Sequence, residues 1–394
     1  MMNAGEYKAK VIFIGPVPPP YMGPTLATEI LLRSRLAREY RLLHLDNSDH
    51  REMDKLGAVD FWNIVLPLWS YVVLLWMLIR HRPQAVYVPI SQTTLGYLKD
   101  SVYIIIAKLF GRRVISHLRG GYFRQWLQSA SALTRWYVKR VHGLVDAQIV
   151  LGDSLRNMFE GILPAERIYV VPNGRNFPDM SKRQALGARL RVLFFGNFNR
   201  SKGVLDVLHA VPQVVASFPA IEFVFAGEWT ESDTRAEIEA FVDKNPSLPV
   251  RVLGRISGQN KLEVLANSDI FVFPTYYPFE GHPWVIVEAM AAGLPVISTD
   301  HAAISESVCH GKTGFLVAKQ SPQAIAEKVL LLAGDERLRA SMGQAGRQRY
   351  EQHFTEESMS ERMVNVFDAV LLPRDVVVQG TPHISPTPDA GGEA

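Results

Sequence analysis

Two glutamates, Glu280 and Glu288, are separated by seven residues in the segment FEGHPWVIVEAMAAGLP, which covers residues 279–295. An ionised carboxylate accepts hydrogen bonds through two oxygens, which suits the neighbouring hydroxyl groups of a sugar or a ribose. The amino terminus of a helix offers free backbone N–H groups and a partial positive charge, which suits phosphate. If a helix begins between the two glutamates, this one segment can bind both parts of a nucleotide-sugar.

The same segment contains signals for a helix over residues 283–292. Pro283 suits the first helical turn, where its missing N–H would be unpaired anyway, and Gly293 suits the helix end. Eight helical steps rotate by roughly 800°, so two carboxylates at this spacing would not share one face of a single helix. Glu280 instead falls in the preceding loop, after the buried strand predicted over residues 269–274. Open parallel sheets bind ligands at this end of a strand.

A second candidate loop follows the strand predicted over residues 191–196. It begins at Gly196, contains Arg200 and Lys202, and leads through Gly203 into a helix. Glycine lets backbone approach a ligand closely, and the two cations could neutralise a diphosphate. An earlier glycine-bearing loop, which ends near Gly23, has the same place after the first strand. Neither loop matches the dinucleotide fingerprint or a P-loop.

Two histidines lie near these candidate positions. His117 occurs at the carboxyl end of a predicted strand, where it is either a structural core residue or a residue that faces the ligand. His282 lies beside Glu280, where it could contact the ligand or belong to a surface loop. The remaining histidines have no spacing typical of a metal site, and Cys309 is the only cysteine, so we expect no metal centre and no internal disulfide.

Charge divides the chain into two halves. Residues 1–185 contain 24 Lys/Arg and 14 Asp/Glu, a net charge of +10, whereas residues 186–394 have a net charge of −7. No acidic residue occurs between Asp100 and Asp146, and aromatic residues alternate there with cations. This interval is either a solvated basic face or a docking surface for anionic lipid or a phosphate-bearing acceptor. It contains no nucleic-acid recognition motif, and we expect no nucleic-acid partner.

Residues 61–79, FWNIVLPLWSYVVLLWMLI, form the longest apolar run. Their number fits a membrane span, but Asn63, Pro67 and Ser70 interrupt the run. Spanning would also separate the strands predicted over residues 10–15 and 85–90, which we expect to be neighbours in one sheet. We therefore expect a helix packed on the sheet, with contact to a bilayer surface left open. The first residues lack the apolar run of a signal peptide.

Apolar strand patterns alternate with helical patterns along both halves, which predicts two doubly wound parallel sheets with a boundary near residues 172–190. Among the helices we predict single helices over residues 25–39 and 124–141 and a short one over residues 153–160. After Pro373 the composition is polar and contains Pro and Gly, which is typical of a disordered tail.

These features together resemble the retaining nucleotide-sugar glycosyltransferases of family 4, of the group 1 type, over most of residues 8–372. The most specific part is the Glu280–Glu288 segment, which continues to Glu306 and to the sequence KTGFLV at residues 312–317. The resemblance implies the GT-B fold, in which two Rossmann-like α/β domains face each other across a cleft. It also implies an acceptor-binding domain, a linker, a nucleotide-sugar-binding domain, a helix that crosses back and a disordered tail, over residues 1–175, 176–190, 191–355, 356–372 and 373–394.

The resemblance also implies roles for single residues. Glu288 would bind the ribose hydroxyls, and Glu280 would contact the donor sugar. The other expected donor-binding residues act through backbone N–H groups, opposite charge or contact with the base: Gly23, Gly196, Arg200, Lys202, Arg255, Gly281 and His282. Transfer would retain the anomeric configuration and use no metal or other cofactor, with the nucleotide-sugar as co-substrate and cations and backbone dipoles stabilising the leaving group.

Three positions depart from the family pattern. The glycine that opens the second loop is often followed by Arg, but here Asn197 follows it, and Arg200 is the possible replacement. The first loop usually has paired glycines, whereas here Pro24 follows Gly23. Many members carry His just before a glycine after the fourth strand; here Arg119 has that place and His117 precedes it by two residues. Both are therefore candidates to face the anomeric carbon.

The expected function is sugar transfer to a glycan or lipid-linked acceptor in the synthesis of cell-envelope polysaccharide, lipopolysaccharide or exopolysaccharide. The expected location is the cytoplasm, with the inner face of the membrane as a site of peripheral contact through the N-terminal domain. Two alternatives are open: a nucleotide-sugar epimerase with the same fold, which would need no acceptor, and a non-catalytic membrane-binding protein.

Overall fold

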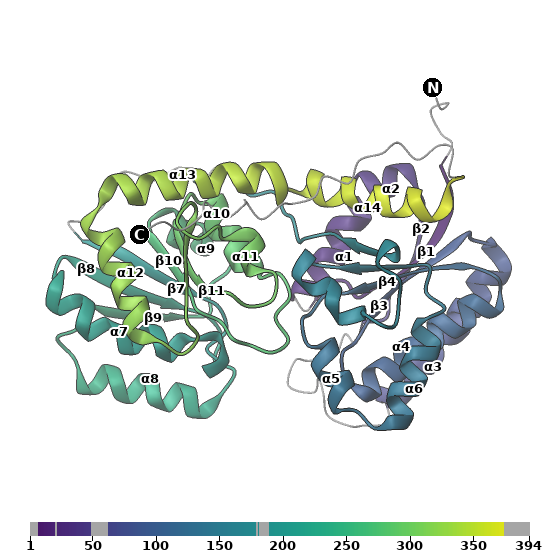
Figure 1. Cartoon of the computed structure of the whole chain (residues 1–394), viewed down its shortest axis with the longest axis horizontal. Coiled ribbons are helices and arrows are strands. Elements are labelled where there is room, and N and C mark those ends of the chain that lie inside the picture. The colour runs from purple at the N-terminus through teal and green to yellow at the C-terminus, as the bar shows by residue number, and fades with distance from the viewer. Residues whose placement is uncertain (1–6, 20–21, 49–61, 179, 181–188, 374–394) are drawn as a thin grey trace. The chain divides into compact units, whose positions relative to one another are not determined.

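The computed structural model describes residues 7–19, 22–48, 62–178, 180 and 189–373. The predicted tail after Pro373 and most of the predicted linker lie outside these residues. The described chain separates into two compact units. The first unit contains the residues up to Gly174 together with the last helix, and the second unit contains Arg175–Thr355. Figure 1 shows that each unit is a sheet with helices on both faces.

The first unit contains a six-stranded sheet in the order β2-β1-β3-β4-β5-β6. All neighbouring strands that pair in it are parallel. The strands are β1 Lys10–Ile14, β2 Arg41–Leu45, β3 Ala85–Ile90, β4 Arg113–Leu118, β5 Ala147–Val150 and β6 Ile168–Val170. Continuous apolar runs are typical of parallel strands covered on both faces, and β5 is accordingly buried along its whole length.

Helices cover both faces of this sheet. They are α1 Gly23–Arg33, α2 Arg35–Glu39, α3 Trp62–His81, α4 Thr94–Leu109, α5 Phe123–Ser129, α6 Ala132–His142 and α14 Glu356–Leu371. The helix α4 packs against β3, α3 and α6, whereas α14 packs against α2 and β4 (Figure 1). The helix α14 is held by an ion pair of 2.8 Å between Lys8 Nζ and Asp368 Oδ2 and by an edge contact between the Tyr40 and Phe367 rings.

Two helices predicted as single elements are each broken by a serine. Ser34 ends α1 in an extended conformation, and its Oγ accepts a hydrogen bond from Leu36 N at 3.2 Å, so it also caps α2. Ser131 caps α6 in the same way through Thr134 N at 3.1 Å. Serine side chains compete for backbone groups in this manner at helix starts. The short helix predicted over residues 153–160 is a 3₁₀ helix, Asp153–Phe159.

The second unit contains a parallel six-stranded sheet in the order β12-β11-β10-β7-β8-β9. The strands are β7 Leu190–Phe195, β8 Ile221–Ala226, β9 Val250–Gly254, β10 Ile270–Phe273, β11 Val296–Thr299 and β12 Gly314–Val317. Its helices are α7 Val204–Ser217, α8 Ser232–Lys244, α9 Gly258–Ala266, α10 Trp284–Ala291, α11 Ile304–Ser307, α12 Pro322–Gly334 and α13 Glu336–His353.

The helices of the second unit divide between the two faces of its sheet. The helix α7 packs against α12, and α10 packs against α13 (Figure 1). The strand order reverses direction between β7 and β10, because β8 and β9 extend the sheet to one side and β10, β11 and β12 extend it to the other. Ligands of open α/β sheets bind beyond the carboxyl ends of the strands at such a reversal.

No helix in the part of the chain that the structure describes is long and apolar enough to cross a membrane. The apolar run predicted as a packed helix is α3, which contacts α4 and β2.

Candidate active site

The reversal of strand order in the second unit brings two predicted loops together. The loop after β7 contains Lys202, and the loop after β10 contains Glu280. Since β7 and β10 pair directly, these loops leave the sheet side by side. Lys202 Nζ lies 2.6 Å from Glu280 Oε2, and the two side chains are 17% and 11% exposed. The fold thus joins the basic loop to the glutamate loop, which the sequence could only pair by analogy.

Further contacts hold this ion pair in place. Thr275 Oγ1 donates a hydrogen bond of 3.1 Å to the same oxygen of Glu280. Lys202 Nζ lies 4.2 Å from the centre of the Tyr277 ring, a cation–π contact. Glu280 N donates to Tyr277 O at 3.0 Å, which closes the loop as a turn. The ammonium and the carboxylate are therefore both oriented at the carboxyl end of β10.

The loop that carries Lys202 requires a glycine at its end. Residues 200–202 form one 3₁₀ turn, and Asn199 Oδ1 accepts a hydrogen bond from Ser201 N at 2.9 Å. Gly203 follows with φ +79°, a left-handed conformation that glycine adopts without strain. A Cβ atom at Gly203 would lie 2.6 Å from Pro274 O. The absence of a side chain thus lets the loop after β7 touch the end of β10.

A second lysine–glutamate pair lies in the same unit. Lys261 Nζ, on α9, is 2.6 Å from Glu288 Oε1, on α10, and lies 5.3 Å from the centre of the Phe195 ring. Glu288 is 3% exposed, and its other oxygen, Oε2, is buried without a hydrogen-bond partner among the described residues. Buried polar atoms are almost always hydrogen-bonded, so this oxygen is an unmet acceptor.

The helix that carries Glu288 starts one residue later than predicted. Pro283 is the N-cap, with an extended backbone, and α10 begins at Trp284. Glu288 is therefore the fifth residue of α10, and Glu280 lies outside the helix as expected. The residue before the helix is proline, so the first helical N–H groups have no side-chain cap. Among these groups, Ile286 N donates to the carbonyl of Pro283 at 3.2 Å.

Two other predicted cations do not join the Lys202–Glu280 pair. Arg200 pairs with Glu237 on α8, and its backbone N–H donates to Glu231 Oε2 at 2.9 Å. Arg255 lies after β9, is 63% exposed at its side chain and is 3.5 Å from Glu228 Oε1. The structure therefore brings one of the three cations, Lys202, to the predicted sugar-contacting glutamate.

The predicted glycine and histidine positions are packed closely around the loops. A Cβ atom at Gly196 would lie 2.8 Å from the Phe273 ring. Gly281 is buried, and its carbonyl accepts a hydrogen bond from Ala303 N at 3.0 Å. His282 is 3% exposed and its Nε2 bonds Ser307 Oγ at 2.6 Å, so the alternative of a surface-loop histidine is wrong. The imidazole joins the loop to α11 through Ser307, and its contact with a ligand stays a prediction.

In the first unit, His117 and Arg119 share one hydrogen-bonded cluster. His117 is in β4, is 1% exposed, and its Nδ1 lies 2.8 Å from Tyr87 Oη. Arg119 follows β4, and its guanidinium donates to Asn173 Oδ1 at 3.3 Å and to Tyr87 Oη at 3.5 Å. If Arg119 donates to that oxygen, the Tyr87 hydroxyl can donate to Nδ1 of His117, which leaves the proton of a neutral ring on Nε2.

Burial sets the charge of His117. Desolvation, and then the positive charge of Arg119, hold the pKa of His117 well below its usual value, so the ring is neutral near pH 7. Its Nε2 is buried without a partner among the described residues. Arg119 is only partly buried and is the more accessible of the two candidates. The predicted Gly23 begins α1 beyond the end of β1.

Residues 178–349 match the family model "Glycosyl transferases group 1". This range covers most of the second unit, with both lysine–glutamate pairs. The second unit is a group 1 glycosyltransferase domain. The group 1 resemblance predicted from the Glu280–Glu288 segment is thereby confirmed.

Curated relatives resemble part of the chain. The capsular polysaccharide biosynthesis glycosyltransferase CapM of Staphylococcus aureus is 30% identical over 179 residues, 45% of this chain and 46% of CapM. A GDP-mannose-dependent monoacylated α-(1-6)-phosphatidylinositol monomannoside mannosyltransferase of Corynebacterium glutamicum is 31% identical over 173 residues, 43% of this chain and 44% of the relative. The chain thus matches less than half the length of these two relatives.

Solved structures match nearly the whole chain. HepE of Anabaena, in complex with UDP, has a TM-score of 0.70 at 18% identity and covers 91% of this chain and 99% of its own. A glycosyltransferase from Rickettsia africae has a TM-score of 0.71 at 14% identity and covers 93% and 99%. The predicted fold class is confirmed: the chain has two Rossmann-like α/β units of the GT-B type.

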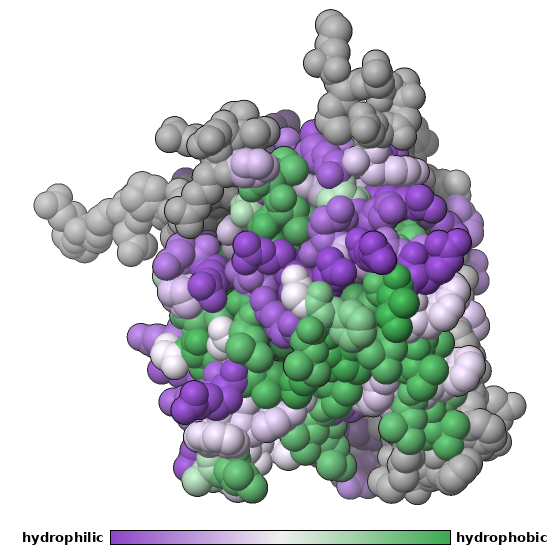
Figure 2. Space-filling view, turned by 90° about the vertical axis from the view of Figure 1, so that its right-hand side faces the viewer, coloured by the Kyte–Doolittle hydropathy of each residue, from purple (hydrophilic) through white to green (hydrophobic). Residues whose placement is uncertain are grey.

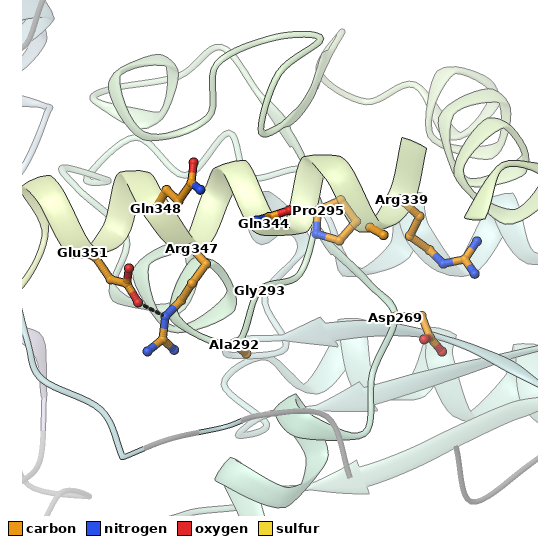
Figure 3. Close-up of a pocket in the computed structure, with 10 residues that line it drawn as sticks. Asp269, Ala292, Gly293, Pro295, Arg339, Gln344, Arg347, Gln348 and Glu351 are labelled. Carbon is orange, nitrogen blue, oxygen red and sulfur yellow. Dashed lines mark hydrogen bonds and ion pairs between the residues drawn. The ribbon is translucent and has the colours of Figure 1, made fainter. Parts of the chain in front are cut away.

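The glycosyltransferase domain also has a pocket of 520 Å³ away from these side chains (Figure 3). Its lining includes Asp269 and Pro295, which precede β10 and β11, so it lies at the amino ends of the strands rather than at their carboxyl ends. Arg347 and Arg339 enter it from α13. Arg347 donates to Ala291 O in the last turn of α10, and Arg339 donates to Leu332 O in the last turn of α12 at 2.7 Å. Carbonyls at helix ends lack a partner within the helix, and these bonds satisfy them. These arginines stabilise helix ends.

Sequence reasoning missed three residues of the site: Lys261, Thr275 and Tyr277. Lys261 lies 27 positions before Glu288 in a segment with no glycine-rich or charged pattern. A lysine in the first turn of α9 was the only local signal, because cations are unfavourable near the positive end of a helix dipole. Among the described residues, no group of three or more His, Cys, Asp or Glu side chains is placed to hold a metal ion.

Proposed function

We propose that the chain is a retaining, family 4 glycosyltransferase that moves a sugar from a nucleotide-sugar to a hydroxyl of a glycan or lipid-linked acceptor. The observation that supports this most is the Lys202–Glu280 ion pair at the strand reversal of a group 1 glycosyltransferase domain. The pair combines a cation for phosphate with a carboxylate for hydroxyl groups, at the end of the sheet where ligands of this architecture bind.

In the proposed reaction the leaving diphosphate replaces Glu280 as the partner of Lys202. The ammonium then balances the negative charge that grows as the bond between the anomeric carbon and the phosphate oxygen breaks. Backbone N–H groups of Gly281 and His282, before α10, are proposed to add dipoles with the same sign. Glu280, released from Lys202, accepts hydrogen bonds from the donor sugar. Gly196 and Gly23 are proposed to let the backbone approach the donor beyond the ends of β7 and β1.

The proposed role of Glu288 is to accept hydrogen bonds from the two ribose hydroxyls. Its buried, unpaired Oε2 supports this, because a ligand hydroxyl would supply the missing donor. Lys261 occupies Oε1 and shields the carboxylate from solvent, so the ribose must enter beside the Lys261 side chain. The strand end at Arg255 is proposed to line the base, and Arg200 to act at longer range from its pair with Glu237.

Retention requires the acceptor oxygen to bond to the face of the anomeric carbon from which the diphosphate departs. The electron pair of the broken bond leaves on the diphosphate, and the acceptor hydroxyl passes its proton to the departing phosphate oxygen. No metal or other cofactor enters this scheme. Of the two candidates in the first unit, Arg119 is the more accessible, so we propose that it faces the donor and that His117 orients it through Tyr87.

The proposed acceptor belongs to cell-envelope polysaccharide, lipopolysaccharide or exopolysaccharide synthesis, on the cytoplasmic side of the membrane. The similarity to CapM and to the phosphatidylinositol mannosyltransferase supports an envelope role, and the net charge of +10 in residues 1–185 suits an anionic lipid surface. Nucleic acid is not proposed as a partner.

A panel of nucleotide-sugars tests the proposal. The full chain is mixed with each donor, and melting temperature and donor hydrolysis are measured together; a productive donor should raise the melting temperature and be hydrolysed slowly. Product analysis with the donor alone distinguishes the epimerase, which would convert the sugar without an acceptor. If no donor changes the melting temperature or is consumed, the transferase proposal is wrong and a non-catalytic protein is favoured.

A further inference from the structure

The helix α3 presents an apolar stripe to solvent. Its exposed large side chains are Leu68, Trp69, Val72, Leu75, Trp76 and Ile79. Their spacing of one, three, three, one and three residues places them on one face of an α-helix. Trp69 is 66% exposed and Trp76 is 59% exposed. Between Leu68 and Ile79 every exposed side chain is apolar, which is the reverse of the usual surface helix.

The opposite face of α3 is fixed to the protein. Leu74 and Leu78 are buried, and Ser70 Oγ hydrogen-bonds Tyr103 Oη on α4. Tyr71 Oη donates to Lys99 O at 2.8 Å. Because these contacts use the inner face, α3 is held on α4 with its apolar stripe outward. It can therefore lie along a surface but cannot leave the unit to span a bilayer.

The apolar surface continues onto the neighbouring helices. The helix α4 packs against both α3 and α6. Both α4 and α6 add exposed large apolar side chains to those of α3. These are Leu95, Leu98 and Leu109 on α4, and Leu133 and Trp136 on α6. Figure 2 shows a broad continuous apolar area with hydrophilic residues at its border. Scattered apolar residues are normal on a surface, but a continuous area of this kind marks an interaction site.

The charge around this layer has one sign. Residues 62–145 contain eleven Lys/Arg and one acidic residue, Asp100, which is 4% exposed. Arg80 and Arg82 follow the stripe at the end of α3, and Lys139 and Arg140 lie on α6; all four are exposed. Lys108 and Arg113 are the cations of this segment that pair with Asp146. A partner for this surface must therefore be apolar and bear negative charge.

We propose that the layer of α3, α4 and α6 is a docking face for an anionic lipid bilayer, with α3 lying in the plane of the interface. The tryptophans Trp69 and Trp76 lie at the depth of the headgroups, where amphipathic rings concentrate, and the cations contact lipid phosphates. Binding of an interfacial helix strengthens with the apolar area it buries and with its attraction to anionic lipid, and this face supplies both. This proposal rests on the proposed function in one respect, that the acceptor is linked to lipid.

A second copy of this chain is a less suitable occupant. A twofold interface places the same surface on both sides, so the cations of each layer would face those of the other. The net positive charge of residues 62–145 would then oppose association at low salt, the condition that favours binding to anionic lipid. Charge complementarity therefore selects the bilayer over self-association.

The test is sedimentation of the full chain with vesicles of phosphatidylcholine, with or without phosphatidylglycerol, at low and high salt. Wild-type protein should bind the vesicles with phosphatidylglycerol at low salt, with a blue shift of tryptophan fluorescence, and should be released by salt. Combined Trp69→Ser and Trp76→Ser substitutions should weaken binding by about tenfold or more. Leu331→Ser, at an exposed apolar residue of α12 in the other unit, is the matched control and should bind as wild type.

Three outcomes would overturn the proposal. They are no binding of the wild type to anionic vesicles at low salt, binding unchanged by the double tryptophan substitution, and a dimer in light scattering that the same substitution disperses. Melting temperatures verify that each variant is folded. Donor hydrolysis in vesicle-free solution separates the two proposals: hydrolysis without vesicle binding rejects the docking face alone, and vesicle binding without hydrolysis of any donor rejects the transferase alone.

Discussion

The two sheets of this protein are built alike but differ in the chemistry at their surfaces. Both have six parallel strands, but the first reverses direction between β1 and β3 and the second between β7 and β10. In the second unit, two nearly buried lysine–glutamate pairs follow the strand ends. In the first unit, the cluster at the end of β4 consists of aromatic, histidine and arginine side chains, and the outer helices are apolar and basic.

This difference fits the division of roles that we propose for the two units. Lysine and glutamate side chains that pair in the absence of a ligand can exchange partners for phosphate and hydroxyl groups, which suits recognition of a charged small molecule. An apolar and basic exterior suits a large surface instead. The family model also matches the second unit and not the first, as expected if the donor is shared among relatives and the acceptor is not.

The largest expected effect comes from Lys202. Lys202→Met should lower kcat/KM for donor hydrolysis by about 10²–10³, because it removes the cation that we propose balances the leaving group. Arg200→Met, two residues away, is the matched control and should change the same quantity by less than about threefold, since Arg200 pairs with Glu237 in solvent. If both variants lost the same kcat/KM, the distinction between Lys202 at the site and Arg200 outside it would be wrong.

The next effect concerns acid stability of the first unit. Burial lowers the pKa of His142 to about 4, although the hydrogen bond that His142 Nε2 donates to Gln148 Oε1 opposes this. The unfolded chain takes up the proton near pH 6.5 and the folded chain does not, so stability falls as the pH drops from about 6.5 to 4, by about 3 kcal/mol in total. Above pH 6.5 both states are neutral and the term vanishes. His117 is also held neutral and acts in the same direction.

Urea unfolding at pH 7 and pH 4.5 measures this term. His142→Gln should reduce the difference in unfolding free energy between the two pH values, whatever its effect at pH 7. His209→Gln, at an exposed position of the second unit, controls for the loss of an imidazole and should leave the difference as in wild type. An unchanged difference in His142→Gln would contradict the assignment.

A smaller effect is expected at the loop that positions Lys202. Gly203→Ala should destabilise the second unit by about 2 kcal/mol, because it combines a left-handed backbone with a Cβ atom 2.6 Å from Pro274 O. Gly254→Ala has φ +65° but no atom within 4 Å of the new Cβ, so it should cost about 1 kcal/mol. Thermal unfolding of both variants separates the contribution of backbone strain from that of steric overlap. If both variants lose the same unfolding free energy, the proposed steric overlap at Gly203 is wrong.

The smallest effect is expected at Arg255. Its side chain is 63% exposed and its Nη1 lies 3.5 Å from Glu228 Oε1, a loose surface pair. Arg255→Ala should therefore change the KM for the donor by less than about threefold and leave kcat unchanged. A larger rise in KM would mean that Arg255 turns toward the base when the donor binds. Arg255 would then contribute to donor binding in addition to Lys202.

Much of the second unit could be predicted from local patterns. Apolar runs bounded by glycine or proline predict β7 and β10. The residues that follow these two strands predict the loops that carry Lys202 and Glu280. The predicted helix over residues 283–292 was one residue too long at each end, and at its start the reason is that Pro283 fits both an N-cap and a first turn. In the first unit, Ser34 and Ser131 broke predicted helices, since a serine in an otherwise helical pattern gives a weak signal until its Oγ is seen to cap the next turn.

The sequence by itself determined the alternation of strands and helices, the position of Glu280 before a helix and the change of charge between the halves. These depend on side-chain periods and turn residues that act over a few positions. Tertiary structure decided which charges meet. Lys202 pairs with Glu280 across 78 positions, because strand order places β7 beside β10. Lys261 pairs with Glu288 across 27 positions, from α9 to α10. It also decided that the apolar run of residues 61–79 has an outward face, since packing on α4 can bury one side of a helix and leave the other exposed.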